Sequence, residues 1–269
     1  MKRCRVIIRG GGDIATGVAH KLKRCGMEVI VLECEKPMAI RRKVAFSEAV
    51  YENKSLVEGI TGVLVSSLED AVKESRVERV PILVDPKGKS ISELKPHVVV
   101  DAIIAKKNIG TEMNMAPVVI ALGPGFTAGS DCHVVVETMR GHDLGRLIYN
   151  GQALANTGNP GSVGGYSLER VIHSPSDGIL KAVKAIGDTV LAGEVLAYAG
   201  ETEVKSQISG IIRGMLHDGI QVRKGLKMAD VDPRADQVKN CYTISDKARC
   251  IGGSVLEAIM AEFLRKKEF

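Results

Sequence analysis

Short apolar runs alternate with amphipathic segments over the first third of the chain. Residues 5–9 form an apolar run that ends in glycines, which is typical of a buried strand. In residues 14–24 the apolar side chains recur four positions apart, and Gly26 follows this segment, so the spacing predicts a helix. A β-branched run at residues 29–32 comes next. This order predicts a right-handed strand–helix–strand unit.

The alternation continues with three more short apolar runs, at residues 63–65, 82–84 and 98–100. A segment with helical spacing, residues 68–73, lies between the first two runs. Strands that alternate with helices predict a parallel sheet covered by helices. We therefore expect an α/β Rossmann-like domain, which binds a nucleotide or cofactor, over residues 1–115.

The glycine-rich, β-type part of the chain that follows contains an internal repeat. Four of its positions recur 32 residues later: Gly178, Gly187, Val190 and Gly193 return as Gly210, Gly219, Val222 and Gly225. A fixed offset indicates a duplicated structural unit, and each copy predicts a strand, a glycine-containing turn and a second strand. We expect an all-β domain of the barrel-sandwich-hybrid type over residues 116–234.

The last part of the sequence predicts one amphipathic helix. Ser245 or Asp246 can cap its N-terminus, and apolar side chains recur at helical spacing from Ile251 to Phe263. We expect a C-terminal helical segment over residues 235–269. The predicted architecture therefore consists of a Rossmann-like domain, a β domain and a helix that closes it.

Composition and charge exclude several classes of function. Hydrophobic residues make up 45% of the chain and charged residues 26%, as in an ordinary globular protein. Aromatic residues make up only 3% and the net charge is only +5, which argues against a nucleic-acid-binding surface. No stretch approaches the roughly 18 apolar residues of a membrane span, and the N-terminal apolar run is too short for a signal peptide. We expect a cytoplasmic protein that binds neither nucleic acid nor membranes.

The six cysteines include no pair with CxxC spacing. The sequence therefore predicts neither a zinc site nor a disulfide framework, and no other metal site is expected. Buried structural cysteines are the favoured interpretation. The reactivity of Cys34 and Cys132, which lie near candidate sites, stays open because it depends on the charges around each thiol.

The sharpest motif is the turn RGGGDIATG at residues 9–17. It follows a predicted strand and opens a predicted helix, which is the context in which backbone N–H groups bind a pyrophosphate. An acidic residue ends the second strand, 23 positions after the first glycine, where it can accept a hydrogen bond from a ribose hydroxyl. A turn of this shape that binds nothing is the alternative. The cofactor-binding candidates here are Gly10, Gly11, Gly12, Asp13, Ile14 and Glu33.

Three other segments offer candidate chemistry. Gly123 and Gly125 in ALGPGFTAG either form a second anion-binding turn or simply end a strand. Lys106 follows a strand that ends at Asp101, where open sheets place ligands, although adjacent lysines also suit a solvated surface. The segment ETMRGHDLGR gathers groups for acid–base work or anion binding, or forms a polar loop. Its catalytic candidates are Glu137, Arg140 and His142.

Taken in order along the chain, the motifs resemble the YqeB-type family. They are RGGGDIATG, VVVDAIIAKKN, ALGPGFTAG, ETMRGHDLGR, KMADVDPR and SDKARCIGGSVLEAI. The resemblance covers nearly the whole chain. It implies a bacterial accessory protein for maturation of a selenium-dependent molybdenum hydroxylase, with the phosphate of a molybdopterin-type cofactor on the glycine-rich turn. It carries over no catalytic residues.

The duplicated segment also resembles the barrel-sandwich fold of biotinyl and lipoyl carriers. Those proteins carry a modified lysine in the turn between their two halves. Here the tip of that turn is Ala199-Gly200, without a lysine. We therefore expect no biotin or lipoyl group, and interpret the module as structural or as a docking surface.

Three functions remain open from the sequence. The first is an accessory protein that binds a molybdopterin-type or nucleotide cofactor, the second an NAD(P)-dependent oxidoreductase, and the third a non-catalytic docking scaffold. The expected partners are a small phosphate-bearing ligand and a molybdenum hydroxylase. Whether the chain is an enzyme, and whether it forms a dimer, also stays open.

Overall fold

The computed structural model describes residues 4–158 and 161–266. The chain forms two compact units. The first combines residues 45–157 with the segments before residue 38 and after residue 243, and the second combines residues 38–44 with 158–243. How the chain divides into independently folding domains stays a prediction. Residues 1–3 and 267–269 of the predicted first and last segments lie outside the described residues.

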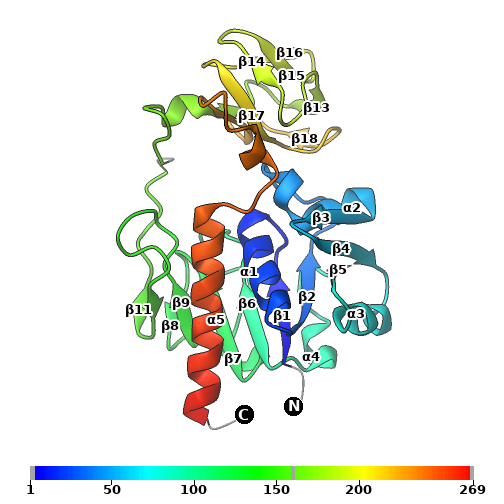
Figure 1. The fold of residues 1–269 in the computed structure, drawn as a ribbon, viewed down its shortest axis with the longest axis vertical. Helices are drawn as coiled ribbons and strands as arrows, with labels where there is room; N and C mark the ends of the chain where they lie inside the picture. The colour runs from blue at the N-terminus through cyan, green and yellow to red at the C-terminus, as the bar shows by residue number, and fades with distance from the viewer. Residues whose placement is uncertain (1–3, 159–160, 267–269) are drawn as a thin grey trace. The chain divides into compact units, whose positions relative to one another are not determined.

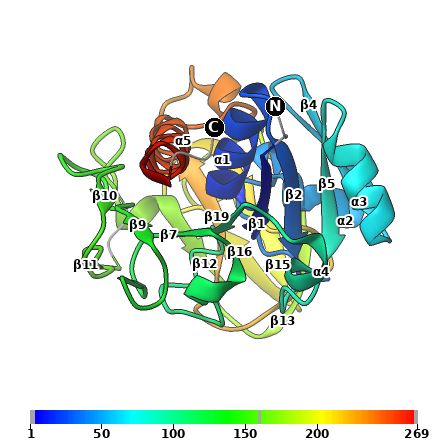
Figure 2. The same ribbon diagram turned by 90° about the horizontal axis from the view of Figure 1, so that it is seen from below.

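One nine-stranded sheet forms the centre of the first unit (Figures 1 and 2). Its strand order is β10-β9-β7-β6-β1-β2-β5-β4-β3. The interior strands run parallel to one another, whereas β3 and β10 pair antiparallel at the two edges. The strands are β1 (Arg5–Arg9), β2 (Glu28–Glu33), β3 (Lys54–Val57), β4 (Ile60–Val65), β5 (Arg79–Val84), β6 (Val98–Asp101), β7 (Val118–Leu122), β9 (Val134–Val136) and β10 (Leu147–Ile148).

The central strands are apolar at successive positions because both faces of the sheet are covered. Val6, Ile7 and Ile8 of β1 are all fully buried, as are Val98, Val99 and Val100 of β6. A parallel strand between two helical layers needs such a continuous apolar run rather than an alternating one. A small antiparallel pair, β8 (Thr127–Ala128) with β11 (Gly151–Gln152), lies beside this sheet in the first unit.

Five α-helices and five short 3₁₀ turns complete the described chain. Ser67 caps α3 by accepting a hydrogen bond from the Asp70 N–H, a favoured N-cap arrangement. No described helix is long and apolar enough to cross a membrane. The helices are α1 (Asp13–Arg24), α2 (Ala49–Glu52), α3 (Leu68–Ser75), α4 (Ile91–Leu94) and α5 (Asp246–Lys266), and the 3₁₀ turns are η1 (Arg42–Val44), η2 (Phe46–Glu48), η3 (Met113–Met115), η4 (Leu168–Arg170) and η5 (Val238–Cys241).

Helices α1 and α5 pack side by side although they are distant in the sequence (Figures 1 and 2). A Cβ atom on Gly17 would lie 2.7 Å from the Ala248 Cβ and 2.8 Å from the Ala248 oxygen. A Cβ atom on Gly252 would lie 2.8 Å from the Gly17 oxygen. Only glycine therefore permits the two backbones to approach this closely.

The second unit consists of two four-stranded antiparallel sheets, ordered β12-β19-β17-β14 and β16-β15-β13-β18. Its strands are β12 (Val171–His173), β13 (Gly178–Ala182), β14 (Thr189–Val190), β15 (Val195–Ala199), β16 (Thr202–Lys205), β17 (Gly210–Met215), β18 (Gln221–Val222) and β19 (Lys227–Asp232).

The 32-residue repeat is visible as a symmetric exchange of strands in this unit. The first strand of one copy, β13, pairs with β18 of the other copy, and Gly178 lies opposite Val222. In the same way, β17 pairs with β14, and Gly210 lies opposite Val190. The two pairings are equivalent under the 32-residue offset, as expected for a duplicated unit.

Several local predictions for the first unit are confirmed. The run at residues 5–9 is β1, and its parallel partner β2 contains residues 29–32. The helix between them is α1, and the predicted tail helix is α5. The local pattern therefore located these elements correctly.

The predicted fold class is wrong. The nine-stranded sheet is mixed rather than parallel throughout, and it takes β7, β9 and β10 from beyond residue 115. The C-terminal helix packs on α1 and belongs to the first unit rather than closing a β domain. The observed architecture is a nine-stranded mixed sheet with several smaller antiparallel sheets and a C-terminal helix. Hydrophobic periodicity indicates where each strand lies along the chain but not which strand it pairs with. The strand order of the sheet could therefore not be predicted from it.

Candidate functional site

The candidate site lies at the carboxyl ends of the parallel strands. Strand β1 lies in the sheet between β2, which follows it directly along the chain, and β6, which follows much later. The connections leaving β1 and entering β6 therefore run in opposite directions across the sheet. In open α/β sheets, such a switch point forms a crevice that commonly binds ligands.

The glycine-rich turn occupies this switch point. Gly10 has φ +92° and donates its N–H to the Leu32 oxygen at 2.8 Å. A Cβ atom on Gly10 would lie 3.0 Å from the Ala102 oxygen, so both the backbone angle and the space require glycine. Gly12 differs, because a Cβ atom there meets nothing within 4 Å. The turn is therefore packed at its first glycine and open at its last.

Helix α1 begins at this open end without a side-chain cap. Gly12 is its N-cap residue at φ −64°, and no side chain accepts a hydrogen bond there. The first intrahelical bond runs from the Thr16 N–H to the Gly12 oxygen at 2.8 Å. The amides of the first helical turn have no acceptor within the helix, and the helix dipole adds a partial positive charge at the same end.

The structure brings Glu33 against the turn, as the sequence spacing predicted. One carboxylate oxygen of Glu33 accepts the Gly11 N–H at 2.8 Å, and the other accepts the Cys34 N–H at 2.8 Å. Glu33 therefore holds the end of β2 to the turn. Whether it also binds a ligand stays a prediction.

A segment that the sequence did not single out covers the other side of the turn. The Ser47 N–H donates to the Gly11 oxygen at 2.9 Å, and the Phe46 N–H donates to the Thr16 hydroxyl at 2.8 Å. Ser47 is buried, and its hydroxyl has no hydrogen-bond partner among the described residues. An unsatisfied buried hydroxyl beside a ligand-binding turn is a group that a ligand or a water molecule can complete.

A buried hydrogen-bonded network of Arg9, Thr111 and Asp101 lies beside the switch point. Thr111 donates its hydroxyl to the Asp101 carboxylate at 2.6 Å and accepts a hydrogen bond from Arg9. The Arg9 guanidinium lies 3.6 Å from the same carboxylate oxygen, and all three side chains are buried. Burial raises the pKa of Asp101, although the Thr111 hydroxyl and the Arg9 charge oppose this shift. The network ties the ends of β1 and β6 together.

Lys247, also missed by sequence reasoning, adds a cation near the turn at the start of α5. Burial lowers the pKa of Lys247, and the charge of Arg140 lowers it further, whereas Asp13, Glu137 and Asp246 act in the opposite direction. Lys247 is half-buried and interacts electrostatically with Asp13, in the first turn of α1, and with Glu137, after β9. The site therefore contains a partly buried ammonium group as well as a helix N-terminus.

Two of the three catalytic candidates, Glu137 and Arg140, form hydrogen bonds within the protein. Glu137 is buried and accepts the N–H groups of Met139 at 2.7 Å and Leu154 at 2.8 Å. Arg140 forms two hydrogen bonds to Asp246, at 2.9 and 3.0 Å, and this carboxylate raises its pKa. His142 is exposed on a turn. A catalytic role for any of them stays a prediction.

The second glycine-rich turn, at Gly123 and Gly125, packs closely against other residues of the protein. A Cβ atom on Gly123 would lie 2.5 Å from the Thr138 hydroxyl oxygen, and one on Gly125 would lie 2.4 Å from the Lys107 Cα. Lys106 is exposed on the loop that packs against Gly125. Packing alone thus requires both glycines, and their contact with a ligand stays a prediction.

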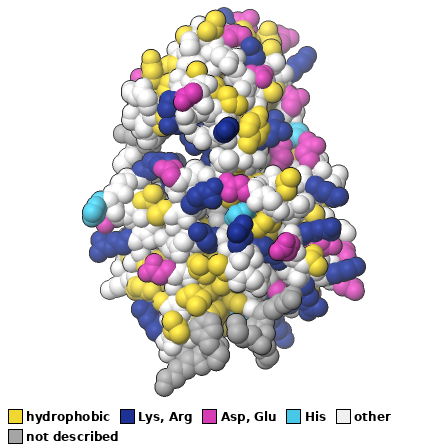
Figure 3. All heavy atoms as spheres, in the orientation of Figure 1, with side chains coloured by type: hydrophobic (Ala, Val, Ile, Leu, Met, Phe, Trp, Pro, Cys, Tyr) yellow, Lys and Arg dark blue, Asp and Glu magenta, His cyan; other side chains and the backbone are white. Residues whose placement is uncertain are grey.

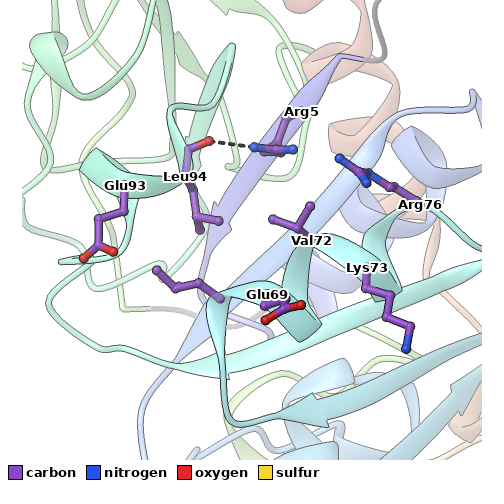
Figure 4. Close-up of a pocket in the computed structure, with 8 residues that line it drawn as sticks. Arg5, Glu69, Val72, Lys73, Arg76, Glu93 and Leu94 are labelled. Carbon is purple, nitrogen blue, oxygen red and sulfur yellow. Dashed lines mark hydrogen bonds between the residues drawn. The ribbon is translucent and has the colours of Figure 1, made fainter.

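A pocket of about 730 Å³ lies at the opposite end of the sheet (Figure 4). It is lined by α3, α4 and Arg5, the first residue of β1. Arg5 donates to the Leu94 oxygen at 2.8 Å, and charges of both signs surround it. The pocket lies at the amino ends of the parallel strands, away from the glycine-rich turn at the other end of β1.

The thiols near the site are expected to be unreactive at neutral pH. Burial, followed by the Glu33 charge, raises the pKa of Cys34 to about 11, and burial, followed by the Asp131 charge, raises that of Cys132 to about 12. At pH 8 about one Cys34 thiol in a thousand is then ionised, and the thiolate is the nucleophile.

Iodoacetamide at pH 8 should label the exposed Cys25 and Cys250 first, as peptide mass spectrometry can show. Labelling of Cys34 as fast as Cys25 would contradict this expectation.

No family model matches the chain. The curated protein named "Uncharacterized protein YqeB" from Escherichia coli (strain K12) is 51% identical over 255 residues, which are 95% of this chain and 47% of that protein. This chain therefore spans about half the length of the curated relative it matches. The match agrees with the family name inferred from the motifs, and the relative's name states no activity.

Three solved structures are similar at low sequence identity. Ectoine utilization protein EutE (DoeB) from Ruegeria pomeroyi, in its product-bound form, is 10% identical, with 85% of both chains covered and a TM-score of 0.26. An aspartoacylase family protein from Mesorhizobium loti is 10% identical, covers 86% of this chain and 85% of its own, and has a TM-score of 0.26. A succinylglutamatedesuccinylase/aspartoacylase from Rhodobacter sphaeroides is 12% identical, with 85% of both chains covered and a TM-score of 0.26. These structures are therefore only distantly similar to this chain.

Proposed function

We propose that this chain is an accessory protein that binds a phosphate-bearing cofactor, of molybdopterin or nucleotide type, at the carboxyl edge of the nine-stranded sheet. The observation that carries the proposal is the uncapped N-terminus of α1, which opens from a glycine turn at the switch point between β1 and β6. A helix N-terminus in this place offers N–H donors and a positive dipole end to a phosphate.

Two further features support an anionic ligand. Lys247 is half-buried and interacts electrostatically with Asp13 in the first turn of α1, and partial burial strengthens the attraction of an ammonium group for a phosphate. The buried Ser47 hydroxyl beside Gly11 lacks a partner among the described residues. The motif resemblance adds the biological context, which is maturation of a selenium-dependent molybdenum hydroxylase.

No contact in the described chain favours the oxidoreductase alternative over this proposal. It would need Glu33 to accept ribose hydroxyls in addition to the Gly11 and Cys34 N–H groups that it already accepts. It would also need an acid–base residue near a nicotinamide, and the sequence candidate His142 is exposed on a turn. We therefore do not propose it.

Substitution of Gly12 tests the proposed binding site without disturbing the fold. A side chain at Gly12 meets nothing within 4 Å and the backbone angle suits any residue, so Gly12→Ser and Gly12→Asp should both fold and, as N-caps, gain a few tenths of a kcal/mol, about 0.3. The aspartate carboxylate would repel a phosphate, at a cost of about 1 to 4 kcal/mol. We expect Gly12→Asp to bind molybdopterin at least about tenfold more weakly than the parent, and Gly12→Ser to bind it almost as well.

Equilibrium dialysis with molybdopterin, and with ADP as the nucleotide probe, provides the measurement, and thermal unfolding provides the control for folding. Equal affinity of Gly12→Asp and the parent would show that the ligand binds elsewhere. If the parent binds neither probe at millimolar concentration, the cofactor proposal is wrong, and the docking-scaffold hypothesis would replace it.

A further inference from the structure

A second, basic pocket opens between the outer faces of α1 and α5, within the first unit. It has a volume of about 380 Å³, which lies in the range of small-molecule sites. Figure 3 shows Lys and Arg side chains gathered on the face over these two helices. The polar and charged residues that line this pocket are His20, Lys21, Arg24, Cys25, Glu58 and Arg249.

The single carboxylate of this pocket is already neutralised. Glu58 forms an ion pair with Arg249 at 2.5 Å and accepts the Ile244 N–H at 2.8 Å with the same oxygen. Burial raises the pKa of Glu58, but these hydrogen bonds outweigh it and hold the pKa below its usual value. Glu58 is therefore ionised at neutral pH and its charge is taken up by Arg249.

Two cations of the pocket have no such partner. Lys21 and Arg24 lie three positions apart on α1, which places them on the same side of the helix. Neither side chain forms a hydrogen bond or ion pair with any residue in the described part of the chain. The helix dipole favours cations at this C-terminal turn, but it does not replace a counter-ion inside a pocket. Two positive charges thus face the cavity without compensation.

His20 fixes the inner wall of the pocket. It is only 7% exposed, and its Nε2 lies 3.2 Å from the carbonyl oxygen of Glu58, to which it must donate. Glu58 and Gly59 are the two central residues of the β3–β4 hairpin, both with positive φ, as a tight two-residue turn requires. The hairpin tip, α1 and α5 are thereby held around one cavity.

We propose that this pocket is a second anion site, which binds a phosphate or diphosphate group of a small molecule. The two uncompensated cations match the charge of a phosphate dianion, and an arginine fork beside a lysine is a common arrangement for phosphate recognition. Lys21 lies nine residues along α1 from Gly12, about 13 Å at the helical rise. The site is therefore separate from the glycine-rich turn and does not depend on the proposed function of that turn.

Cys25 provides a built-in reporter for this site. It is exposed and lines the pocket, whereas Cys250 is exposed but does not line it. With inorganic pyrophosphate as the probe, we expect alkylation of Cys25 by N-ethylmaleimide to slow at least about fivefold, while that of Cys250 is unchanged. Sodium chloride at equal ionic strength should not protect Cys25, because screening alone does not fill a pocket.

Matched double variants decide whether the pocket cations bind the probe. Lys21→Gln with Arg24→Gln should abolish the protection of Cys25 and weaken pyrophosphate binding, measured by calorimetry, at least about tenfold. Lys87→Gln with Lys89→Gln removes the same charge from exposed positions outside the pocket and should retain both. Gly12→Asp should also retain both, which separates this site from the turn. Protection that survives in the first variant, is lost in Gly12→Asp, or is reproduced by chloride would overturn the proposal.

Discussion

Gly17→Leu is expected to lower the free energy of unfolding by about 3 kcal/mol, because it forces a side chain into the α1–α5 contact. A Cβ atom on Gly17 would already lie 2.7 Å from the Ala248 Cβ and 2.8 Å from the Ala248 carbonyl oxygen, which belongs to the backbone and has little room to move. Gly17→Ala should cost about 1 to 2 kcal/mol, since the clash exceeds the gain of about 1 kcal/mol in helix propensity.

A second glycine supplies the matched control. Gly253 lies on α5, next to Gly252, but a Cβ atom there meets nothing within 4 Å. Gly253→Ala should therefore stabilise the protein by about 0.5 to 1 kcal/mol through helix propensity alone. Urea unfolding followed by circular dichroism measures all three variants. If Gly17→Leu unfolds at the same urea concentration as the parent, the two helices do not pack as described.

Arg9→Met should cost about 3 to 5 kcal/mol at pH 7, because it leaves the Asp101 carboxylate buried without its counter-charge. Arg9, Thr111 and Asp101 are all at most 2% exposed, so solvent cannot replace the lost guanidinium. The double variant Arg9→Met with Asp101→Asn removes both charges and should recover part of the loss. Thermal or urea unfolding of the two variants gives the comparison.

The same variant should show a distinctive dependence on pH. The pKa of Asp101 is raised in the folded protein, above the unfolded value of about 3.9. A raised carboxyl pKa favours folding at low pH, and this contribution is lost as pH rises through the folded pKa. Removal of Arg9 raises the folded pKa further, so the deficit of Arg9→Met should grow between about pH 4 and pH 7. A deficit that is constant over this range would mean that Asp101 is not the group left uncompensated.

Local structure in the first unit could be predicted because its signals are local. The apolar run of β1, the glycines after it and the helical spacing of α1 lie within one stretch of about twenty residues. The pairing of α1 with α5 left only a faint signal, the small residues Gly17, Ala248 and Gly252 on two distant segments. The order of the nine strands left none, since it depends on pairings between strands far apart in the sequence.

In the candidate site, too, only the residues positioned by local structure could be predicted from the sequence. Glu33 was found because its spacing from the glycine turn is set by the strand–helix–strand unit itself. Ser47 contacts the turn, and Lys247 interacts electrostatically with Asp13, from segments whose positions depend on tertiary packing. Arg9 did carry a signal, because a charged residue at the end of a fully apolar strand requires a buried counter-charge. Its partner Asp101 ends the neighbouring strand β6.

The exchanged strands of the second unit make the two copies of the repeat depend on each other. Each copy of the 32-residue repeat supplies a first strand whose partner is the short second strand of the other copy, as in β13 with β18 and β17 with β14. One copy alone would leave both strands with unpaired edges, and such edges associate with another chain. Neither copy therefore completes its sheets alone, and the pairing between the two copies closes these edges within one chain.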